Sequence, residues 1–128
     1  MERRYDIQGV EAIDEKVLDT IEYEYPGKRI EVEIAYPEFT SVCPFSGLPD
    51  FAEIIIKYVP NKKCIELKSL KYYLHSYRNV GIYQEHVVNR IMEDLVQLCD
   101  PLEMTIVGKF NIRGGMGTVI RREYKKEG

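Results

Sequence analysis

The segment Ile82–Cys99 constrains the fold of this chain more than any other. Apolar residues recur along it at helical spacing, and polar residues fill the positions between them. This pattern predicts an amphipathic helix that buries one face, and the Asp100-Pro101 pair that follows is typical of a helix end. The predicted buried stripe contains Val87, Val88, Ile91, Leu95 and Leu98, and the predicted polar face contains Asn89, Arg90, Glu93, Asp94 and Gln97.

The surface that covers this helix is expected to be a β-sheet, because segments before and after it alternate apolar and polar residues. Strands on both sides of a helical region favour the α+β class, with an antiparallel sheet and helices on one face. We expect one domain, with residues 1–17 as an arm. The predicted elements are a hairpin of Leu18–Tyr25 and Arg29–Tyr36, a hairpin of Phe51–Val59 and Cys64–Ser69, a helix at Leu70–Arg78, and strands at Leu102–Ile112 and Thr118–Tyr124.

Composition limits the class of protein. Of 128 residues, 45% are hydrophobic and 30% charged, which is ordinary for a soluble globular chain. No apolar run approaches the roughly 20 residues needed to cross a bilayer, and the polar N-terminus does not resemble a signal peptide. We therefore expect a cytoplasmic protein. An odd number of cysteines in a reducing compartment argues against disulfides.

Charge is distributed unevenly along the chain. Residues 1–56 hold 5 Lys or Arg and 13 Asp or Glu, whereas residues 57–128 hold 13 and 8. The basic excess suits a ligand that bears phosphate, although its C-terminal part, Arg121–Lys126, is typical of a solvated face. The net charge of −3 argues against direct binding of nucleic acid.

Cys43 lies in Thr40–Asp50, a segment broken by two prolines and a glycine. A thiol in a rigid turn, with the carboxylate of Asp50 close behind it, suits a nucleophile and its proton donor. Free cysteines are nevertheless more often buried and inert. These residues alone leave both interpretations open. A metal site built from Cys43, Cys99 and a histidine has no recognisable ligand spacing.

Three further segments carry groups suited to a ligand. The segment Arg113–Gly117 looks like a phosphate loop, but a strand is predicted after it, so a hairpin turn explains its glycines first. Lys68 and Lys71 would share a helical face near Glu66, or else form a lysine-rich surface edge. Glu85, at the start of the long helix, suits either the helix dipole or a guanidine-like ligand edge.

Together these motifs resemble the QueF family of NADPH-dependent 7-cyano-7-deazaguanine reductases. The resemblance covers about residues 20–124 and implies the tunnelling fold, in which four-stranded antiparallel sheets of several subunits join into a barrel-like ring. It further implies active sites between subunits of a homo-oligomer, with two rings stacked into a decamer. The matching segments are Pro37–Thr40, Cys43-Pro44, Gly47–Ala52, Glu66–Tyr73, Arg78-Asn79, Tyr83–Glu85 and Phe110–Gly115.

The activity implied by the resemblance is reduction of a nitrile to a primary amine, with NADPH as cofactor, in the queuosine pathway of tRNA modification. Cys43 would attack the nitrile carbon to give a thioimide, and Asp50 would protonate the nitrogen. No metal is expected. The implied ligand contacts are Ile65, Glu66, Leu67, Gln84 and Glu85 for 7-cyano-7-deazaguanine, and Lys68, Lys71, Arg113, Gly114 and Gly115 for NADPH.

Gln84 departs from the family pattern, which usually has histidine there. Glutamine can hydrogen-bond the substrate but cannot shuttle a proton, so a relay would pass to Asp50, to water or to His86. Three alternative functions stay open: a related amidinotransferase acting on a nitrile in tRNA, a zinc-dependent pterin-type enzyme of the same fold, and a non-catalytic ring-forming binding protein. The intact Glu66–Tyr73 motif favours the reductase.

Overall fold

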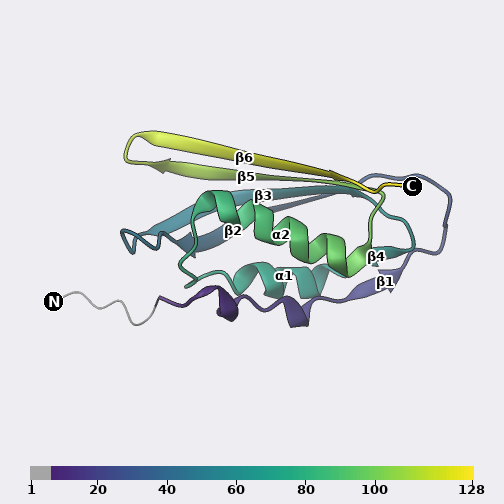
Figure 1. Cartoon of the computed structure of the whole chain (residues 1–128), viewed down its shortest axis with the longest axis horizontal. Helices are drawn as coiled ribbons and strands as arrows, with labels where there is room; N and C mark the ends of the chain where they lie inside the picture. The colour runs from purple at the N-terminus through teal and green to yellow at the C-terminus, as the bar shows by residue number, and fades with distance from the viewer. Residues whose placement is uncertain (1–6) are drawn as a thin grey trace.

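Four long strands form one antiparallel sheet in the computed structural model, which describes residues 7–128. Their spatial order is β2 (Val32–Val42), β3 (Pro49–Val59), β5 (Glu103–Arg113) and β6 (Met116–Lys125). Two short strands, β1 (Thr20–Glu22) and β4 (Lys63–Ile65), form a separate pair. The helices α1 (Leu67–His75) and α2 (Gln84–Cys99) lie on one face of the large sheet (Figure 1). The predicted α+β class is confirmed.

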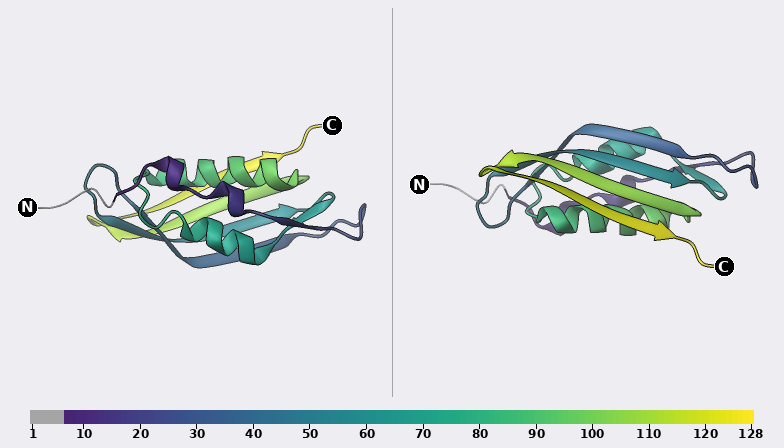
Figure 2. Two further views of the ribbon diagram at one scale, coloured as in Figure 1. Left: turned by 90° about the horizontal axis from the view of Figure 1, so that it is seen from below. Right: turned by 90° about the horizontal axis from the view of Figure 1, so that it is seen from above.

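The core lies between this sheet face and the helices. Alternate side chains of β3 and β5 point to the helices and are buried, and the opposite face of the sheet is left uncovered by the helices (Figure 2). Gly108 of β5 lies beneath α2, where a Cβ atom would come within 2.9 Å of Val88 Cγ2, so only glycine permits this approach. The buried stripe of α2 consists of Val87, Val88, Ile91, Met92, Leu95 and Cys99, with Leu98 only partly buried.

Both predicted hairpins are wrong. Thr20 of β1 lies opposite Ile65 of β4, so the segment around β1 does not pair with Arg29–Tyr36. Instead β2 pairs with β3, and it continues beyond Tyr36 through a bulge to Val42. Alternation shows that a segment is extended, but the pairing partner depends on contacts between distant parts of the chain.

The helix boundaries differ from the predictions for a local reason. The predicted strand Cys64–Ser69 ends at Ile65, and α1 begins at Leu67 because the Glu66 carboxylate caps it. That carboxylate accepts the backbone N–H groups of Lys68 at 3.0 Å and Ser69 at 2.8 Å. The helix ends at His75 and α2 begins at Gln84. Within residues 7–128, neither helix has the length and apolar character needed to cross a membrane.

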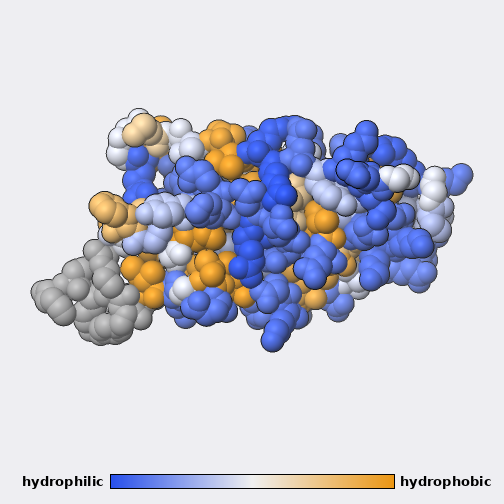
Figure 3. All heavy atoms as spheres, viewed as in Figure 1, coloured by the Kyte–Doolittle hydropathy of each residue, from blue (hydrophilic) through white to orange (hydrophobic). Residues whose placement is uncertain are grey.

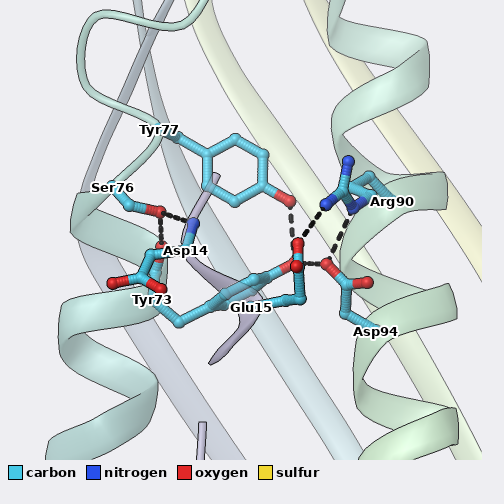
Figure 4. A network of polar contacts seen from close by, with 7 residues as sticks. All are labelled: Asp14, Glu15, Tyr73, Ser76, Tyr77, Arg90 and Asp94. Carbon is cyan, nitrogen blue, oxygen red and sulfur yellow. Dashed lines mark hydrogen bonds and ion pairs between the residues drawn. The ribbon is translucent and has the colours of Figure 1, made fainter. Parts of the chain in front are cut away.

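A partly buried polar network anchors the N-terminal segment. Residues 1–6 of the predicted arm lie outside the described residues, and residues 7–17 contain two 3-10 turns that pack beside α1 and α2 (Figure 1). Arg90 binds Glu15 at 2.6 Å and Asp94 at 2.8 Å, and the Tyr73 hydroxyl donates to Asp94 at 2.6 Å (Figure 4). The Tyr77 hydroxyl lies 2.8 Å from that of Tyr73. We call these five residues the tyrosine network; Asp94 therefore does not lie on a purely solvated face.

Candidate active site

Three connections meet at one end of the sheet, the left end in Figure 1. The loop of residues 43–48 joins β2 to β3, a glycine turn joins β5 to β6, and α2 begins beside them. The end of β2 is fixed to the segment before α2, because the Val42 N–H donates to Val80 O at 3.0 Å and the Ile82 N–H donates to Val42 O at 2.9 Å. Residues distant in sequence are thereby brought together here.

The glycine turn is the predicted hairpin turn. Gly114 and Gly115 have φ values of 64° and 84°, a left-handed conformation that glycine adopts without strain. Because β6 follows directly, this segment is not the phosphate loop of a dinucleotide-binding fold. The turn places Arg113, the last residue of β5, over the 43–48 loop.

A pocket of about 520 Å³ opens at this end. That volume lies within the range of small-molecule sites. Six residues that the sequence predicts as site residues line it: Cys43, Asp50, Gln84, Glu85, Arg113 and Gly114. Four lining residues were not among those predictions, namely Leu48, Tyr83, Met116 and Thr118. Gly115 belongs to the same turn but does not line the pocket.

Asp50 is held by two neighbours from different elements. Its side chain is buried, and its Oδ1 atom lies 3.0 Å from Arg113 Nε. The Gln84 amide donates to the same oxygen at 3.3 Å. Gln84 therefore orients Asp50 in this structure. Since both contacts use Oδ1, Oδ2 is the oxygen left for a ligand in the pocket.

Cys43 is a buried thiol that favours ionisation. Its backbone is fixed within the loop, because the Cys43 N–H donates to Leu48 O at 2.9 Å and the Gly47 N–H donates to Cys43 O at 2.8 Å. A hydrogen bond from the Ser46 hydroxyl, helped by backbone N–H groups and Arg113, lowers the pKa of the Cys43 thiol to about 7 despite burial. A substantial thiolate fraction therefore exists near neutral pH.

Neither of the other cysteines lines the pocket. Cys99 is buried in the core, and burial raises the pKa of its thiol to about 12. Cys64 is half-buried, and all three cysteines are free. Within residues 7–128, His, Cys, Asp and Glu side chains nowhere form a group of three that could hold a metal ion. Cys43 is thus distinguished from Cys99 by its hydrogen-bond donors.

The remaining predicted site residues lie elsewhere. Ile65, Glu66, Leu67, Lys68 and Lys71 belong to the end of β4 and the first turns of α1, at the opposite end of the helix layer (Figure 1). The nine residues of α1 span about 13 Å, and it is the far end of α1 that leads toward the pocket. One copy of the chain therefore does not bring these residues to Cys43.

Sequence reasoning missed Ser46 and the apolar rim of the pocket. Ser46 is three residues from Cys43 in the same loop, a spacing that places both in one turn. The Arg113 guanidinium donates to Ser46 Oγ at 3.2 Å. Met116 and Leu48 are large, exposed apolar side chains on neighbouring turns, and only the fold shows that they face one pocket.

The fold and the pocket define an α+β protein with a cysteine–aspartate site, and comparisons with known proteins specify its family. Residues 49–128 match the family model described as QueF, QueF-like protein. The chain belongs to this family, as its motifs predict. The crystal structure of the archaeosine synthase QueF-Like in the apo form has the same fold, with a TM-score of 0.69 and 19% identity over 81% of this chain and 100% of that one.

Curated relatives match nearly the whole chain. It is 59% identical over 98% of its length to a protein from Caldanaerobacter subterraneus subsp. tengcongensis, of which 94% is covered. It is also 59% identical, over 98% of its length, to a protein from Thermoanaerobacter pseudethanolicus, of which 95% is covered. Both relatives are named NADPH-dependent 7-cyano-7-deazaguanine reductase.

Proposed function

We propose that this protein is a cytoplasmic, NADPH-dependent nitrile reductase that converts 7-cyano-7-deazaguanine to 7-aminomethyl-7-deazaguanine for queuosine biosynthesis. The observation that carries the proposal is the shared pocket of an ionisable thiol, Cys43, and a buried carboxylate, Asp50. The names of relatives that are 59% identical over 98% of the chain support the same reaction. The order of its steps follows from the chemistry of these two groups.

The first step joins Cys43 to the substrate. The thiolate attacks the nitrile carbon, a C–S bond forms, and one π bond of the nitrile breaks. Asp50 carries to the nitrogen the proton that the thiol gave up, so that S–H adds across the nitrile and a thioimide results. Cys43 suits both addition and departure, because a thiolate with a lowered pKa is also a good leaving group.

The later steps return the free thiolate. Two NADPH molecules, bound one after the other, would each supply one of the two hydrides that the four-electron reduction requires. After the first reduction the C–S bond breaks, Cys43 leaves as a thiolate, and the substrate carbon becomes an imine. The second reduction gives the amine, and Asp50 is placed to pass the protons that balance the two hydrides.

The pocket rim suits the planar heterocycle. Glu85 stands at the start of α2 with an exposed side chain, where its carboxylate can accept N–H groups of the deazaguanine ring. Tyr83, Leu48 and Met116 offer apolar and aromatic surface to the ring faces. Polar recognition at one edge and apolar contact on the faces is the usual composition of such sites.

Lys68 and Lys71 suit the phosphates of NADPH. Both are exposed on α1, and neither makes an ion pair within the described part of the chain. The Glu66 carboxylate already binds the first N–H groups of the helix. Phosphate would therefore meet the lysine ammonium groups rather than the helix N-terminus.

A complete site would need a second copy of the chain, because Glu66 and the two lysines lie at the opposite end of α1 from Cys43. The outer edges of β2 and β6 have no partner strand within residues 7–128 and suit pairing between copies. Phe45 and Met116, on the turns at the pocket end of the molecule, are 88% and 74% exposed. Figure 3 shows hydrophobic surface gathered toward this pocket end. These features support a homo-oligomer of stacked rings.

The reaction is tested by mixing the protein with 7-cyano-7-deazaguanine and NADPH. We expect two NADPH oxidised for each nitrile consumed, and the amine as product by mass spectrometry. No NADPH oxidation, with an adduct still forming on Cys43, would favour the tRNA amidinotransferase instead. An unreactive Cys43 would exclude both enzymes.

The shared site is tested with two inactive variants. The Cys43→Ala and Glu66→Gln proteins are unfolded and refolded together in equal amounts. Each side of an interface then carries its intact residue half of the time, so roughly a quarter of the interfaces in mixed rings join an intact Cys43 to an intact Glu66. We expect that fraction of wild-type activity to return. A mixture as inactive as its components, with rings intact by light scattering, would contradict a site shared between copies.

A further inference from the structure

Ser46 is the side chain that links the thiol to the arginine. Its hydroxyl oxygen accepts two hydrogen bonds, from Arg113 Nη1 at 3.2 Å and from the Leu48 N–H at 3.2 Å. Both donors belong to groups that are themselves fixed: Arg113 pairs with Asp50, and the Leu48 carbonyl accepts the Cys43 N–H. The oxygen therefore has a defined position above the loop.

The two accepted bonds determine where the hydroxyl proton points. A serine hydroxyl has one proton to donate and two lone pairs with which to accept. Because N–H donors occupy both lone pairs, the proton must be directed at a different neighbour. Cys43 lies three residues before Ser46, in the turn that the bond from the Gly47 N–H to Cys43 O closes, which makes its sulfur the acceptor available to this proton.

We propose that Ser46 is a further catalytic residue, whose hydroxyl donates a hydrogen bond to the Cys43 thiolate and aims the sulfur at the nitrile carbon. The catalytic part of this inference rests on the proposed reduction; the hydrogen bond itself does not. The same contact serves twice, because it stabilises the thiolate that attacks and the thiolate that leaves. Backbone N–H groups of Phe45 and Ser46 add to it.

The other charged and titratable groups around the sulfur come from three elements. Asp50 comes from β3, Arg113 from the end of β5, and Tyr83 and Glu85 from the start of α2. Arg113 and Asp50 neutralise one another in their ion pair at 3.0 Å. Beside the backbone N–H groups of Phe45 and Ser46, the Ser46 hydroxyl is the side-chain donor to the sulfur that does not belong to this pair.

The expected size of the effect follows from the fraction ionised. A thiol with a pKa of about 7 is roughly half thiolate at pH 7, whereas an unperturbed thiol at about 8.5 is only about 3% thiolate. Intrinsic nucleophilicity rises as the pKa rises, but by less than one power of ten over this interval. Loss of the Ser46 hydroxyl is therefore expected to slow thiol reactions at pH 7 by several-fold.

The test measures the alkylation of Cys43 by iodoacetamide as a function of pH, with no nitrile or NADPH present. Modification is quantified on the Cys43 peptide by mass spectrometry. In the wild-type protein the alkylation rate should rise with pH, with the midpoint of the rise near pH 7. We expect Ser46→Ala and Ser46→Gly to raise it by about one unit or more, and Ser46→Thr, which keeps a hydroxyl, to restore it. Ser76→Ala, at the end of α1, is the control and should not shift it.

An unchanged midpoint in folded Ser46→Ala and Ser46→Gly proteins would overturn the proposal, and so would an equal shift in Ser46→Thr. Because alkylation needs neither substrate nor cofactor, a midpoint shift in a protein that fails to oxidise NADPH would overturn the reductase and retain the Ser46–Cys43 hydrogen bond. An active reductase without the shift would overturn Ser46 alone.

Discussion

Within residues 7–128, two clusters of polar groups are each built around an aspartate and an arginine. In the tyrosine network Asp94 binds Arg90 at 2.8 Å, and in the pocket Asp50 binds Arg113 at 3.0 Å. The difference lies in the groups beside each pair. The pocket group, which we call the thiol cluster, consists of Cys43, Ser46, Asp50, Gln84 and Arg113.

The two clusters use similar pairs for opposite purposes. In the tyrosine network protein groups fill the space, and burial raises the pKa values of Tyr73 and Tyr77, which therefore stay neutral (Figure 4). In the thiol cluster a pocket adjoins the pair, and hydrogen-bond donors lower the pKa of Cys43 to about 7. We infer that a closed network anchors the fold, whereas an open cluster leaves a reactive group for a ligand.

The largest expected effect of a conservative change is on Asp50. Asp50→Asn keeps the shape of the side chain but removes the group that carries the proton, so turnover should fall by about 10²–10⁴-fold with little change in substrate binding. Single-turnover kinetics and equilibrium binding separate the two effects. Glu53→Gln, on the same strand but outside the pocket, is the control. Wild-type turnover in Asp50→Asn would remove Asp50 from the mechanism.

The matching change in the tyrosine network should affect stability instead. Asp94→Ala leaves the buried Tyr73 hydroxyl and Arg90 Nε without their acceptor, at a cost of about 2–4 kcal/mol in the free energy of unfolding. Glu93→Ala, at an exposed neighbour on α2, should cost less than about 1 kcal/mol. Urea unfolding gives both values. Equal losses would show that the network does not anchor the fold.

The two clusters should change the stability of the protein in opposite directions as pH rises. The pKa values of Tyr73 and Tyr77 are raised, so their contribution to stability is fully present below the unfolded value of about 10 and is lost as pH rises toward the folded values. Above pH 10 each of the two tyrosines should lower the free energy of unfolding by about a further 1.4 kcal/mol per pH unit. The lowered pKa of Cys43 acts in reverse: its contribution is present above the unfolded value and is lost as pH falls through about 7.

Unfolding measured from pH 7 to 11 tests the alkaline slope. Tyr77→Phe should flatten the slope by about the contribution of one group, because only the unfolded wild-type chain releases that proton. Tyr25→Phe, which removes an exposed hydroxyl, is the control. A Tyr77→Phe slope identical to that of wild type would mean that the hydroxyl ionises equally in both states.

The smallest expected effect concerns Gln84. Gln84→Leu removes the amide that donates to Asp50 at 3.3 Å, and we expect turnover to fall by about tenfold or less, the loss of one hydrogen bond. Gln84→His retains a donor and should lose less. If Gln84→Leu were as damaging as Asp50→Asn, Gln84 would do more than orient Asp50. Steady-state kinetics of the three proteins decide the order.

Sequence periodicity identified the extended segments and the long helix, because one buried face imposes a regular pattern on each. It did not identify which strands pair: β1 joins β4 through contacts that no local pattern encodes. Asp94 also looks solvated from its position on α2, and only the fold brings the Tyr73 hydroxyl to it. Local rules predict elements, whereas tertiary contacts decide partners.

The candidate site divides in the same way. The resemblance to the family's motifs selected Cys43, Asp50, Gln84, Glu85 and Arg113, and the structure places them in one pocket. The sequence did not predict Ser46 as a site residue, because its contact with Arg113 joins the loop to the distant β5–β6 turn. The residues near Glu66 lie outside the pocket of the single chain, so their part in the site stays a prediction about the assembly.

The most direct test of the central claim is the reaction of the three free cysteines with the nitrile. The protein is mixed with 7-cyano-7-deazaguanine in the absence of NADPH, and its intact mass and peptides are measured. We predict a mass increase of one substrate molecule per chain, located on Cys43, absent in Cys43→Ala and retained in Asp94→Ala. A wild-type protein without an adduct, or with the adduct on Cys64 or Cys99, would contradict this account.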